Sequence, residues 1–572
     1  MAKSSDTSGI LFQDMKKGIL AFLIIGFVLF SLTPTFYELS RASDLQPNRS
    51  FELIHNFPTD YNFYLSRIRL GLEGKWTVHE VYTTEPHQGS FIHEMYLLMG
   101  RIGRSVHVPQ NRPADVYHMA RIVFALLLLW VIAIFCLRAF NSFPGANTWS
   151  VMSFLLIVTA SSWPKLVFVE GVPRLGGYMA WWSVMDSLQR ITFIPHLLVG
   201  QALMLGIVLA YMAKLHEKHS GVHIALGILG FVLGLIFPPG LIFVYATLGI
   251  MICLKAFMEK RAVHVVMTES MVPLLGFVCV SAPSLAYLFL MTSFYPWKRL
   301  AELDIIHPLP FDYVEYIKAL GPVFPLGLVG LCIAVWKKER HMILAASWVI
   351  AWLVLLGIFH YVPSQSPLRF SEMVPHVGLG VLAMYTFAFG FHLIKGKRSL
   401  KQVGQFISLF VPIALIILGL FHMYSSYLWQ KDFVDHKIRA SIPLVPTGSY
   451  VMYPLKDFIA GIAYIQQNAN LDAIVLSETT AGNYIPVYSG NRVYVGHDNT
   501  VNAEQKRADT RQFFAGAMSQ IAGREFVRMT GASYIFFGPQ EKEDGGVTDL
   551  ARVYPFVHQV YQNPYVTVYR VR

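Results

Sequence analysis

The sequence predicts an α-helical polytopic membrane protein with about eleven transmembrane helices and a C-terminal α/β domain outside the cytoplasmic membrane. Three observations lead to this fold class. Hydrophobic residues make up 54% of the 572 residues and charged residues only 14%, well below the share in soluble proteins. Apolar runs long enough to cross a bilayer recur through the first three quarters of the chain. The segment 426–572 has an ordinary soluble composition instead.

Eleven apolar runs are the predicted spans. They cover residues 18–37, 116–139, 149–168, 192–213, 221–237, 240–258, 270–291, 318–336, 341–359, 374–394 and 404–425. The third run is interrupted near its outer end by Trp163-Pro164-Lys165, because proline disrupts a helix interior. The first run is long and lacks a small-residue cleavage site, so we expect it to remain as an anchor rather than be removed as a signal.

The distribution of basic residues predicts the orientation in the membrane. On one side of the predicted membrane, the loops contain more Lys and Arg than Asp and Glu, for example at Lys16-Lys17, Lys255 and Lys337-Lys338. Loops with such an excess of basic residues face the cytoplasm. The N-terminus is therefore expected in the cytoplasm, and eleven spans place the C-terminus outside. These loops account for almost all of the net charge of +11, so the charge gives no support for nucleic-acid binding.

Two domains follow from this pattern, a transmembrane domain at 1–425 and an extracytoplasmic α/β domain at 426–572. In the second domain, short runs of β-branched and aromatic residues alternate with helical stretches, which is typical of an α/β domain. The expected strands are 473–476, 492–495, 534–537 and 566–569, and the expected helices lie near 456–467 and 503–530. A first outer loop at 38–115 also departs from the hydrophobic pattern.

Acidic residues gather in the outer loops, whereas the interiors of the spans carry almost no charge. Ion-coupled transporters need ionisable groups near the middle of the membrane, so this distribution argues against that class. The sequence also lacks a phosphate-binding Gly-rich loop, a zinc-binding His pair and a nucleophile elbow. Any chemistry is therefore expected at the outer membrane surface.

The first outer loop holds a candidate helix that starts at an acidic residue. Tyr61, Tyr64, Ile68 and Leu72 recur at helical spacing and predict an apolar face along the membrane interface. Asp60 is expected to cap the N-terminus of this helix, a role that stabilises a helix by about 1 kcal/mol. A second juxtamembrane helix is expected at 91–100.

This arrangement resembles the GT-C superfamily of integral-membrane glycosyltransferases, which use polyprenyl-phosphate-linked sugars. The string Asp60-Tyr61-Asn62-Phe63-Tyr64, with Gly71 and Gly74 downstream, is similar to the first-loop acidic motif of that superfamily. The resemblance covers the whole architecture, including the C-terminal extracytoplasmic domain. It implies an inverting transfer of a hexosyl or pentosyl group, with Asp60 as the general base that deprotonates the acceptor. The paired acidic motif of some members is missing, because Tyr61 and Asn62 follow Asp60.

The second outer loop supplies Asp186 and Arg190. Their i, i+4 spacing on a helix predicts an ordinary surface ion pair. The functional alternative makes Asp186 a second carboxylate near the donor, or a metal ligand, and places Arg190 on the donor phosphate. The sequence does not require a cofactor, and a divalent metal remains open.

Four further residues are candidates for substrate contacts. Arg369 opens a span from an outer loop and could hold two phosphate oxygens of the donor, or anchor the span in the headgroups. Glu85 and His87 lie in a constrained Glu-Pro-His turn and are candidates for the substrate pocket or ordinary loop residues. His497 follows a strand and either binds the acceptor or packs in a turn.

Three classes of function are compatible with these features. The first is a glycosyltransferase that moves a sugar from a polyprenyl-phosphate-linked donor to a glycan, lipid or protein acceptor at the outer face of the cytoplasmic membrane. The second is a glycan ligase or polymerase of similar build. The third is a non-enzymatic lipid-sugar flippase or transporter, which the charge-free spans disfavour. We favour the first, with the donor, the acceptor and the bilayer as partners.

Overall fold

The computed structural model describes residues 6–214, 220–259, 262–362, 365–393, 398–447 and 451–572. Within them the protein is mostly helical and forms two compact units. The first unit comprises Met1–Pro34, Arg121–Ala286 and Pro308–Gln430, and the second comprises Thr35–Ala120, Tyr287–His307 and Lys431–Arg572. The second unit thus groups the whole of the first outer loop (38–115) with the C-terminal segment, a grouping that the sequence does not predict.

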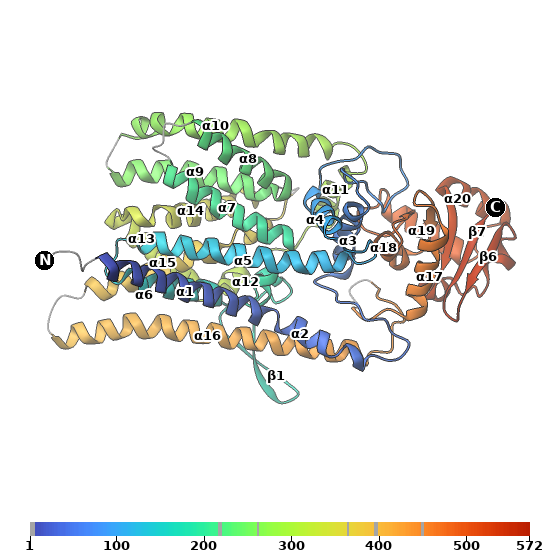
Figure 1. Cartoon of the computed structure of the whole chain (residues 1–572), viewed down its shortest axis with the longest axis horizontal. Coiled ribbons are helices and arrows are strands. Elements are labelled where there is room, and N and C mark those ends of the chain that lie inside the picture. The colour runs from blue at the N-terminus through green and yellow to red at the C-terminus, as the bar shows by residue number, and fades with distance from the viewer. Residues whose placement is uncertain (1–5, 215–219, 260–261, 363–364, 394–397, 448–450) are drawn as a thin grey trace. The chain divides into compact units, whose positions relative to one another are not determined.

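Long apolar helices make up most of the first unit, and neighbouring helices run side by side (Figure 1). They are α1 (Asp6–Ser31), α5 (Pro113–Phe140), α6 (Ala146–Thr159), α7 (Pro195–Lys214), α8 (Ser220–Ile236), α9 (Pro238–Glu259), α10 (Val263–Met291), α12 (Tyr313–Leu320), α13 (Val323–Lys337), α14 (Ile343–Phe359), α15 (Pro375–Leu393) and α16 (Arg398–Arg439). Two fully buried indoles of α14, Trp348 and Trp352, lie in the core of this unit. Helix-on-helix packing of apolar faces therefore holds the unit together.

Seven helices of the described residues are long and apolar enough to cross a membrane, or up to nine if each of two bent pairs is one span. The bent pairs are Gly18–Ser31 with Thr33–Ser40 and Tyr313–Leu320 with Val323–Lys337. Two shorter apolar helices, Ala146–Thr159 and Gly221–Ile236, coincide with the remaining predicted runs. These helices support a multi-pass membrane protein. The sequence predicts eleven spans, which is more than the seven to nine that are long and apolar enough to cross a membrane in the described residues.

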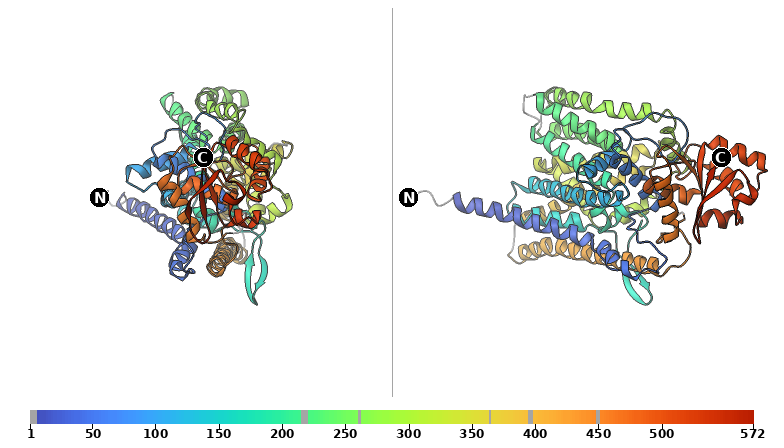
Figure 2. Two further views of the ribbon diagram at one scale, coloured as in Figure 1. Left: turned by 90° about the vertical axis from the view of Figure 1, so that its right-hand side faces the viewer. Right: turned by 45° about the vertical axis from the view of Figure 1, so that its right-hand side comes forward.

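The predicted span at 149–168 is wrong at its outer end. Helix α6 ends at Thr159, and residues further on form the hairpin of β1 (Lys165–Val169) and β2 (Val172–Gly176). Proline at 164 cannot continue a helix, and Glu170 and Gly171 both have positive φ, at 51° and 80°, as a two-residue hairpin turn requires. The hairpin projects from the first unit in every view (Figures 1 and 2).

The second unit contains a five-stranded sheet of order β4-β3-β5-β7-β6. Strands β4, β3 and β5 are parallel to one another. Strand β7 is antiparallel to both of its neighbours, β5 and β6. The strands are β3 (Ile474–Leu476), β4 (Arg492–Val493), β5 (Ala532–Phe537), β6 (Val557–Gln562) and β7 (Thr567–Val571). The sheet confirms the predicted α/β region and all four expected strands, whereas β6 was not predicted.

Helices accompany the sheet in the second unit. They are α17 (Lys456–Asn468), α18 (Thr479–Tyr488), α19 (Ala503–Phe514), α20 (Gln520–Thr530), α21 (Pro539–Gly545) and α22 (Leu550–Val553). The helix expected near 456–467 is confirmed as α17. The single stretch expected at 503–530 is two helices, because Gly516 adopts a positive φ of 65° after α19 and Ser519 caps the N-terminus of α20.

The first outer loop is built into the second unit by buried charges. The Arg49 guanidinium donates to the carbonyls of Leu444 at 2.6 Å and Tyr453 at 2.9 Å. The buried Glu52 carboxylate accepts from the hydroxyls of Tyr484 at 2.7 Å and Tyr488 at 2.5 Å. Buried charges are stable only when they are hydrogen-bonded, so these contacts join the loop to the C-terminal segment as one folded body.

Two helices of the first loop cross at a pair of glycines. Helix α3 (Pro58–Leu72) packs against α4 (Glu94–Ser105). A Cβ atom on Gly71 would lie 2.0 Å from the Leu97 carbonyl oxygen, and one on Gly100 would lie 2.0 Å from that of Ile68. Only glycine permits this backbone approach. Helix α3 is buried on nearly all sides, so it does not have the single apolar face that the sequence predicts.

Two buried carboxylates lie near the carboxyl ends of the parallel strands β3 and β5. Glu541 accepts the backbone N–H of Glu478 at 2.8 Å and that of Gly538 at 3.0 Å. Neither carboxylate oxygen of Glu478 has a hydrogen-bond partner among the described residues, although the side chain is only 1% exposed. Burial, and then the charge of Glu541, raises the pKa of Glu478 to about 8, and burial also raises the pKa of Glu541.

These raised pKa values predict that the sheet loses stability as the pH rises. A folded-state pKa above the unfolded value of about 4.3 means that ionisation favours the unfolded form. The stability that the protonated Glu478 carboxyl contributes is fully present below about pH 4 and is lost as the pH rises through its folded-state pKa of about 8. We expect the corrected hydrogen-exchange protection of β3 and β5 in the full-length protein to fall at least about tenfold between pH 5 and 8.5.

The Glu478→Gln variant should reduce this pH dependence, because glutamine does not ionise. Glu525→Gln is the matched control, since Glu525 is exposed and pairs only with Arg528 on the surface. Protection that stays constant between pH 5 and 8.5 in the wild type would contradict the prediction.

Candidate active site

Asp60 lies in the first turn of α3, but it is not the N-cap that the sequence predicts. Phe57 occupies that position without a side-chain hydrogen bond, and Pro58 is the first helical residue, where its missing N–H and fixed φ are tolerated. The Asp60 side chain is 55% exposed. The carboxylate therefore does not cap the helix with a hydrogen bond and is accessible to a substrate.

His497 faces this carboxylate. Its Nε2 atom lies 3.6 Å from Asp60 Oδ1, and its ring stacks on Phe63 with the centroids 4.6 Å apart. His497 Nδ1 accepts the backbone N–H of Asn499 at 3.1 Å, so the hydrogen of the neutral ring is on Nε2. The side chain is 4% exposed, so a buried imidazole nitrogen lies beside an exposed carboxylate.

A network of buried polar groups holds this pair in place. The Tyr82 hydroxyl donates to the carbonyls of Asn62 and Asn483, both at 3.2 Å. The Asn62 amide donates to the Asn483 side-chain oxygen at 2.8 Å. The Thr500 hydroxyl donates to the Tyr82 carbonyl at 2.7 Å. The start of α3 and the segment 479–500 are therefore fixed to each other, since each buried polar group needs its partner.

Glu85 lies in the same unit, where its charge is neutralised. Its Oε1 atom is 2.6 Å from Lys506 Nζ, and its Oε2 accepts from the Thr83 hydroxyl. Burial alone would raise the pKa of Glu85, but the hydrogen bonds from Lys506 and Thr83 outweigh it and lower this pKa. Burial lowers the pKa of Lys506 more than Glu85 raises it. Both Glu85 oxygens are thus occupied within the protein.

His87 closes the turn that precedes α4. Its Nε2 accepts the Glu80 backbone N–H at 2.9 Å, and its Nδ1 donates to the Glu85 carbonyl at 2.7 Å. Its ring also meets Trp297 edge-on, with the centroids 6.1 Å apart. Both ring nitrogens are engaged, so the structure gives His87 a positioning role in the turn, and its contact with a substrate stays a prediction.

Asp186 and Arg190 belong to the first unit and do not form the predicted i, i+4 pair on a helix. Asp186 precedes the short helix η3 (Gln189–Thr192), and its Oδ1 accepts the backbone N–H groups of Leu188 and Gln189, both at 2.9 Å. The carboxylate thus closes a turn with one oxygen. Its Oδ2 makes no hydrogen bond within the part of the chain that the structure describes.

Arg190 caps the end of α6. Its Nη2 donates to the carbonyls of Ile157 at 3.1 Å, Val158 at 3.0 Å and Ala160 at 2.5 Å, which a helix C-terminus leaves unsatisfied. Burial lowers the pKa of Arg190 to about 10, and the charge of Asp186 opposes this shift. The third run thus ends on a buried guanidinium.

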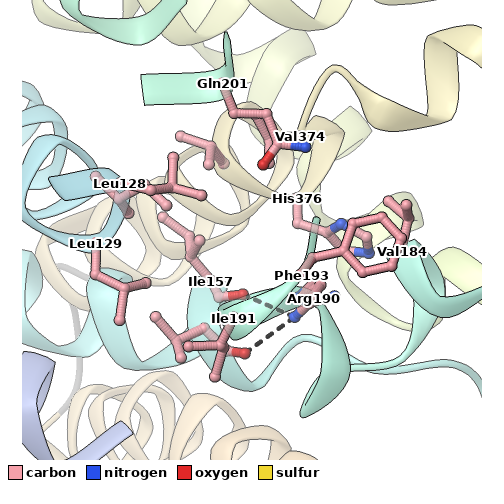
Figure 3. Close-up of a pocket in the computed structure, with 13 residues that line it drawn as sticks. Leu128, Leu129, Ile157, Val184, Arg190, Ile191, Phe193, Gln201, Val374 and His376 are labelled. Carbon is pink, nitrogen blue, oxygen red and sulfur yellow. Dashed lines mark hydrogen bonds between the residues drawn. The ribbon is translucent and has the colours of Figure 1, made fainter. Parts of the chain in front are cut away.

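The other terminal nitrogen of Arg190, Nη1, has no partner in the described residues. Arg190 lines a cavity of about 40 Å³ together with His376 and Gln201 (Figure 3). Such a cavity has room for a water molecule or two. A donor phosphate could reach Nη1 only if these side chains moved.

Arg369 lies half-buried in the short helix η5 (Pro367–Glu372), which precedes α15. The Trp182 indole N–H donates to the Ser371 hydroxyl at 2.9 Å, so η5 packs against the second outer loop. The structure therefore gathers Asp186, Arg190 and Arg369 in the first unit, and Asp60, Glu85, His87 and His497 in the second.

Comparison with protein-family models and with curated sequences gives no match. Among solved structures, the apo oligosaccharyltransferase of Archaeoglobus fulgidus aligns with a TM-score of 0.51 and 11% identity over 97% of this chain and 74% of that chain. The same enzyme, tethered by a disulfide to an acceptor peptide with the NVT sequon, aligns with a TM-score of 0.50, 12% identity and the same coverage.

ArnT from Cupriavidus metallidurans, bound to undecaprenyl phosphate, aligns with a TM-score of 0.50 and 13% identity over 95% of this chain and 97% of that chain. The oligosaccharyltransferase and ArnT are polyprenyl-phosphate-dependent glycosyltransferases of the GT-C superfamily. The chain has the GT-C fold. The resemblance to that superfamily is thereby confirmed at the level of the fold.

Within this GT-C fold, sequence reasoning missed Lys506 and Glu94 near the candidate site. Lys506 is a basic residue of a soluble helix, so only the fold reveals that it neutralises Glu85. Glu94 begins α4, and burial raises its pKa to about 7, with Arg101 acting in the opposite direction. An acidic residue at the start of a juxtamembrane helix, next to a histidine, was the available signal. No group of three or more His, Cys, Asp or Glu suited to a metal ion occurs among the described residues.

A buried ion pair supports the stacked rings of the site. The Arg67 guanidinium, which is 0% exposed, pairs with Glu80 and lies 3.6 Å from the centroid of the Phe63 ring. Glu80 in turn accepts the backbone N–H of Tyr82 at 3.1 Å. The Phe63 ring on which His497 stacks is therefore positioned by a buried guanidinium that cannot lose its partner cheaply.

We expect Glu80→Leu to destabilise α3 strongly, because it leaves the Arg67 charge buried without a partner, at a cost of about 3–5 kcal/mol. Hydrogen exchange of the α3 amides in the full-length protein measures this effect. The double variant Arg67→Met/Glu80→Leu should recover most of the protection, since it removes both charges. Equal loss of protection in the single and double variants would contradict this explanation.

Proposed function

We propose that the protein is a glycosyltransferase that moves a sugar from a polyprenyl-phosphate-linked donor to an acceptor outside the cytoplasmic membrane. The observation that carries the proposal is the exposed Asp60 carboxylate facing the buried His497 N–H at 3.6 Å, in a chain with the GT-C fold. The ligand bound in the ArnT structure, undecaprenyl phosphate, supports a lipid-phosphate carrier. The loop charges support an outer location.

The reaction follows from the chemistry of a carboxylate base. Asp60 takes the proton from a hydroxyl or amine of the acceptor as that atom forms a bond to the anomeric carbon. The bond between the anomeric carbon and the phosphate oxygen breaks, and the lipid phosphate leaves with the electron pair. Attack from the face opposite the phosphate inverts the anomeric configuration.

His497 is a positioning residue in this proposal. Its Nε2 atom lies beside Oδ1 of Asp60, and we propose that this contact holds the carboxylate in place and leaves Oδ2 for the acceptor. The distance of 3.6 Å is longer than a hydrogen bond, but such contacts shorten when substrates bind. Arg369 and Arg190 both stay our candidates for the donor phosphate. The carbonyls at the end of α6 occupy Arg190 Nη2, whereas its Nη1 has no partner in the described residues.

The Asp60→Asn variant should lose transfer by about 10²–10⁴-fold, the usual contribution of a general base. Membranes with the wild type or the variant are supplied with a panel of undecaprenyl-phosphate hexoses and pentoses, and transfer of the radiolabelled sugar is measured. Asp115→Asn is the matched control, because Asp115 is an exposed acid of the same unit that pairs with Arg112. Wild-type rates in Asp60→Asn would exclude Asp60 as the base.

The His497→Phe variant tests the polar role of the imidazole separately from its packing. Phenylalanine retains a ring to stack on Phe63 but lacks the N–H group. Loss of a hydrogen bond to a charged group corresponds to about 10–100-fold in kcat, with little change in KM. His558→Phe in β6 is the control. If His497→Phe lowers kcat no more than this control does, His497 only packs against its neighbours.

A further inference from the structure

A second site lies in the first unit, next to the β1–β2 hairpin. Residues 161–189 of the second outer loop and residues 422–429 of α16 line a cavity of about 330 Å³. This volume reaches the range of ligand pockets, about 300–1,000 Å³, and accommodates a group the size of a sugar ring. We infer that this cavity binds a carbohydrate.

The lining is rich in hydroxyls and carries no net charge. Lys165 is the cation and Asp186 the carboxylate among the lining residues, so the two formal charges cancel. Uncharged hydrogen-bonding groups supply the remaining polar side chains, and they are Ser161, Ser162, Tyr178, Ser187, Gln189, His422, Ser426 and Trp429. A neutral ligand with many hydroxyls matches this set of donors and acceptors.

Two of the lining groups have hydrogen-bonding capacity that the protein does not use. His422 is 7% exposed, and its Nε2 has no hydrogen-bond partner in the described residues. Asp186 uses Oδ1 for two backbone N–H groups and leaves Oδ2 open. A buried nitrogen without a partner is costly, so a ligand hydroxyl that reaches His422 gains a hydrogen bond at little desolvation cost.

Aromatic rings line the same cavity. Trp429 is 43% exposed and lies beside Arg174, whose guanidinium carbon is 5.4 Å from the ring centroid. Tyr178 is the second ring. The C–H face of a sugar ring is apolar and packs on an aromatic face, while its hydroxyls reach the polar groups at the edge. Aromatic and polar groups together distinguish this cavity from a water-filled gap.

A phosphate is a poorer match than a carbohydrate. Asp186 places a negative charge in the lining, which repels an anion. Lys165 is the one cation among the lining residues, and the neighbouring Lys318 and Arg174 lie over the Tyr178 and Trp429 rings. Phosphate sites usually bring several charged or backbone donors to the same oxygens. The observations therefore favour an uncharged sugar over a lipid phosphate headgroup.

The inference rests on the proposed function for its choice of sugar chemistry, but binding at this cavity does not require Asp60. Saturation-transfer NMR of the full-length protein in nanodiscs tests it with four probes, the methyl glycosides of D-glucose, D-mannose, D-galactose and L-arabinose. At least one glycoside should bind the wild type, and its affinity should fall about tenfold or more in Trp429→Ala and in Asp186→Asn. Asp60→Asn should bind the same glycoside as the wild type does while losing sugar transfer.

Trp336→Ala is the matched control, because Trp336 is 71% exposed on α13 and does not line the cavity. Absence of binding by all four glycosides, or equal binding by the wild type and Trp429→Ala, would overturn the inference. Displacement of the glycoside by an equal concentration of sn-glycerol 3-phosphate would also overturn it, in favour of a phosphate site. Hydrogen exchange of the hairpin amides in each variant establishes that the cavity remains folded.

Discussion

The hydrogen bonds between the start of α3 and the segment 479–500 determine the geometry of the candidate active site. Tyr82 and Asn483 form the centre of this network, and each buried polar atom in it limits where α3 can lie. Asp60 is exposed and has few contacts of its own. Its position relative to His497 therefore depends on groups that never meet a substrate, as is common where a site needs fixed geometry.

Buried charges in the second unit serve the same purpose. Arg49, Arg67 and Lys506 are each almost inaccessible to solvent, and each meets carbonyls or a carboxylate at short distance. Paired charges of this kind fix geometry more than they stabilise, because desolvation offsets most of the attraction. Glu478 differs from these three residues, because neither of its carboxylate oxygens has a hydrogen-bond partner in the described residues. Its raised pKa makes the sheet sensitive to pH.

The sequence predicts those parts of the fold that local composition determines. Apolar length located the membrane helices, and runs of β-branched and aromatic residues located four of the strands. It failed where a tertiary partner decides. Asp60 is expected as an N-cap from its residue type, yet Phe57 is the N-cap and Pro58 the first helical residue. The spacing of Asp186 and Arg190 predicts a surface ion pair, yet the Arg190 guanidinium donates to the carbonyls at the end of α6. No local pattern indicates which side chain will reach the open carbonyls of a helix end.

The pairing of Asp60 with His497 was equally inaccessible to sequence reasoning, although both residues were candidates. They are distant in the sequence, and only the packing of α3 against the C-terminal segment brings them together. The contact also assigns the chemical roles within the pair. His497 Nδ1 already accepts a backbone N–H, and Nε2 of the neutral ring carries the hydrogen. The imidazole therefore has no free lone pair for an acceptor proton, whereas the Asp60 carboxylate meets the histidine through Oδ1 and has a second oxygen. If the pair performs base catalysis, the carboxylate is the group that takes the proton, and the imidazole orients it.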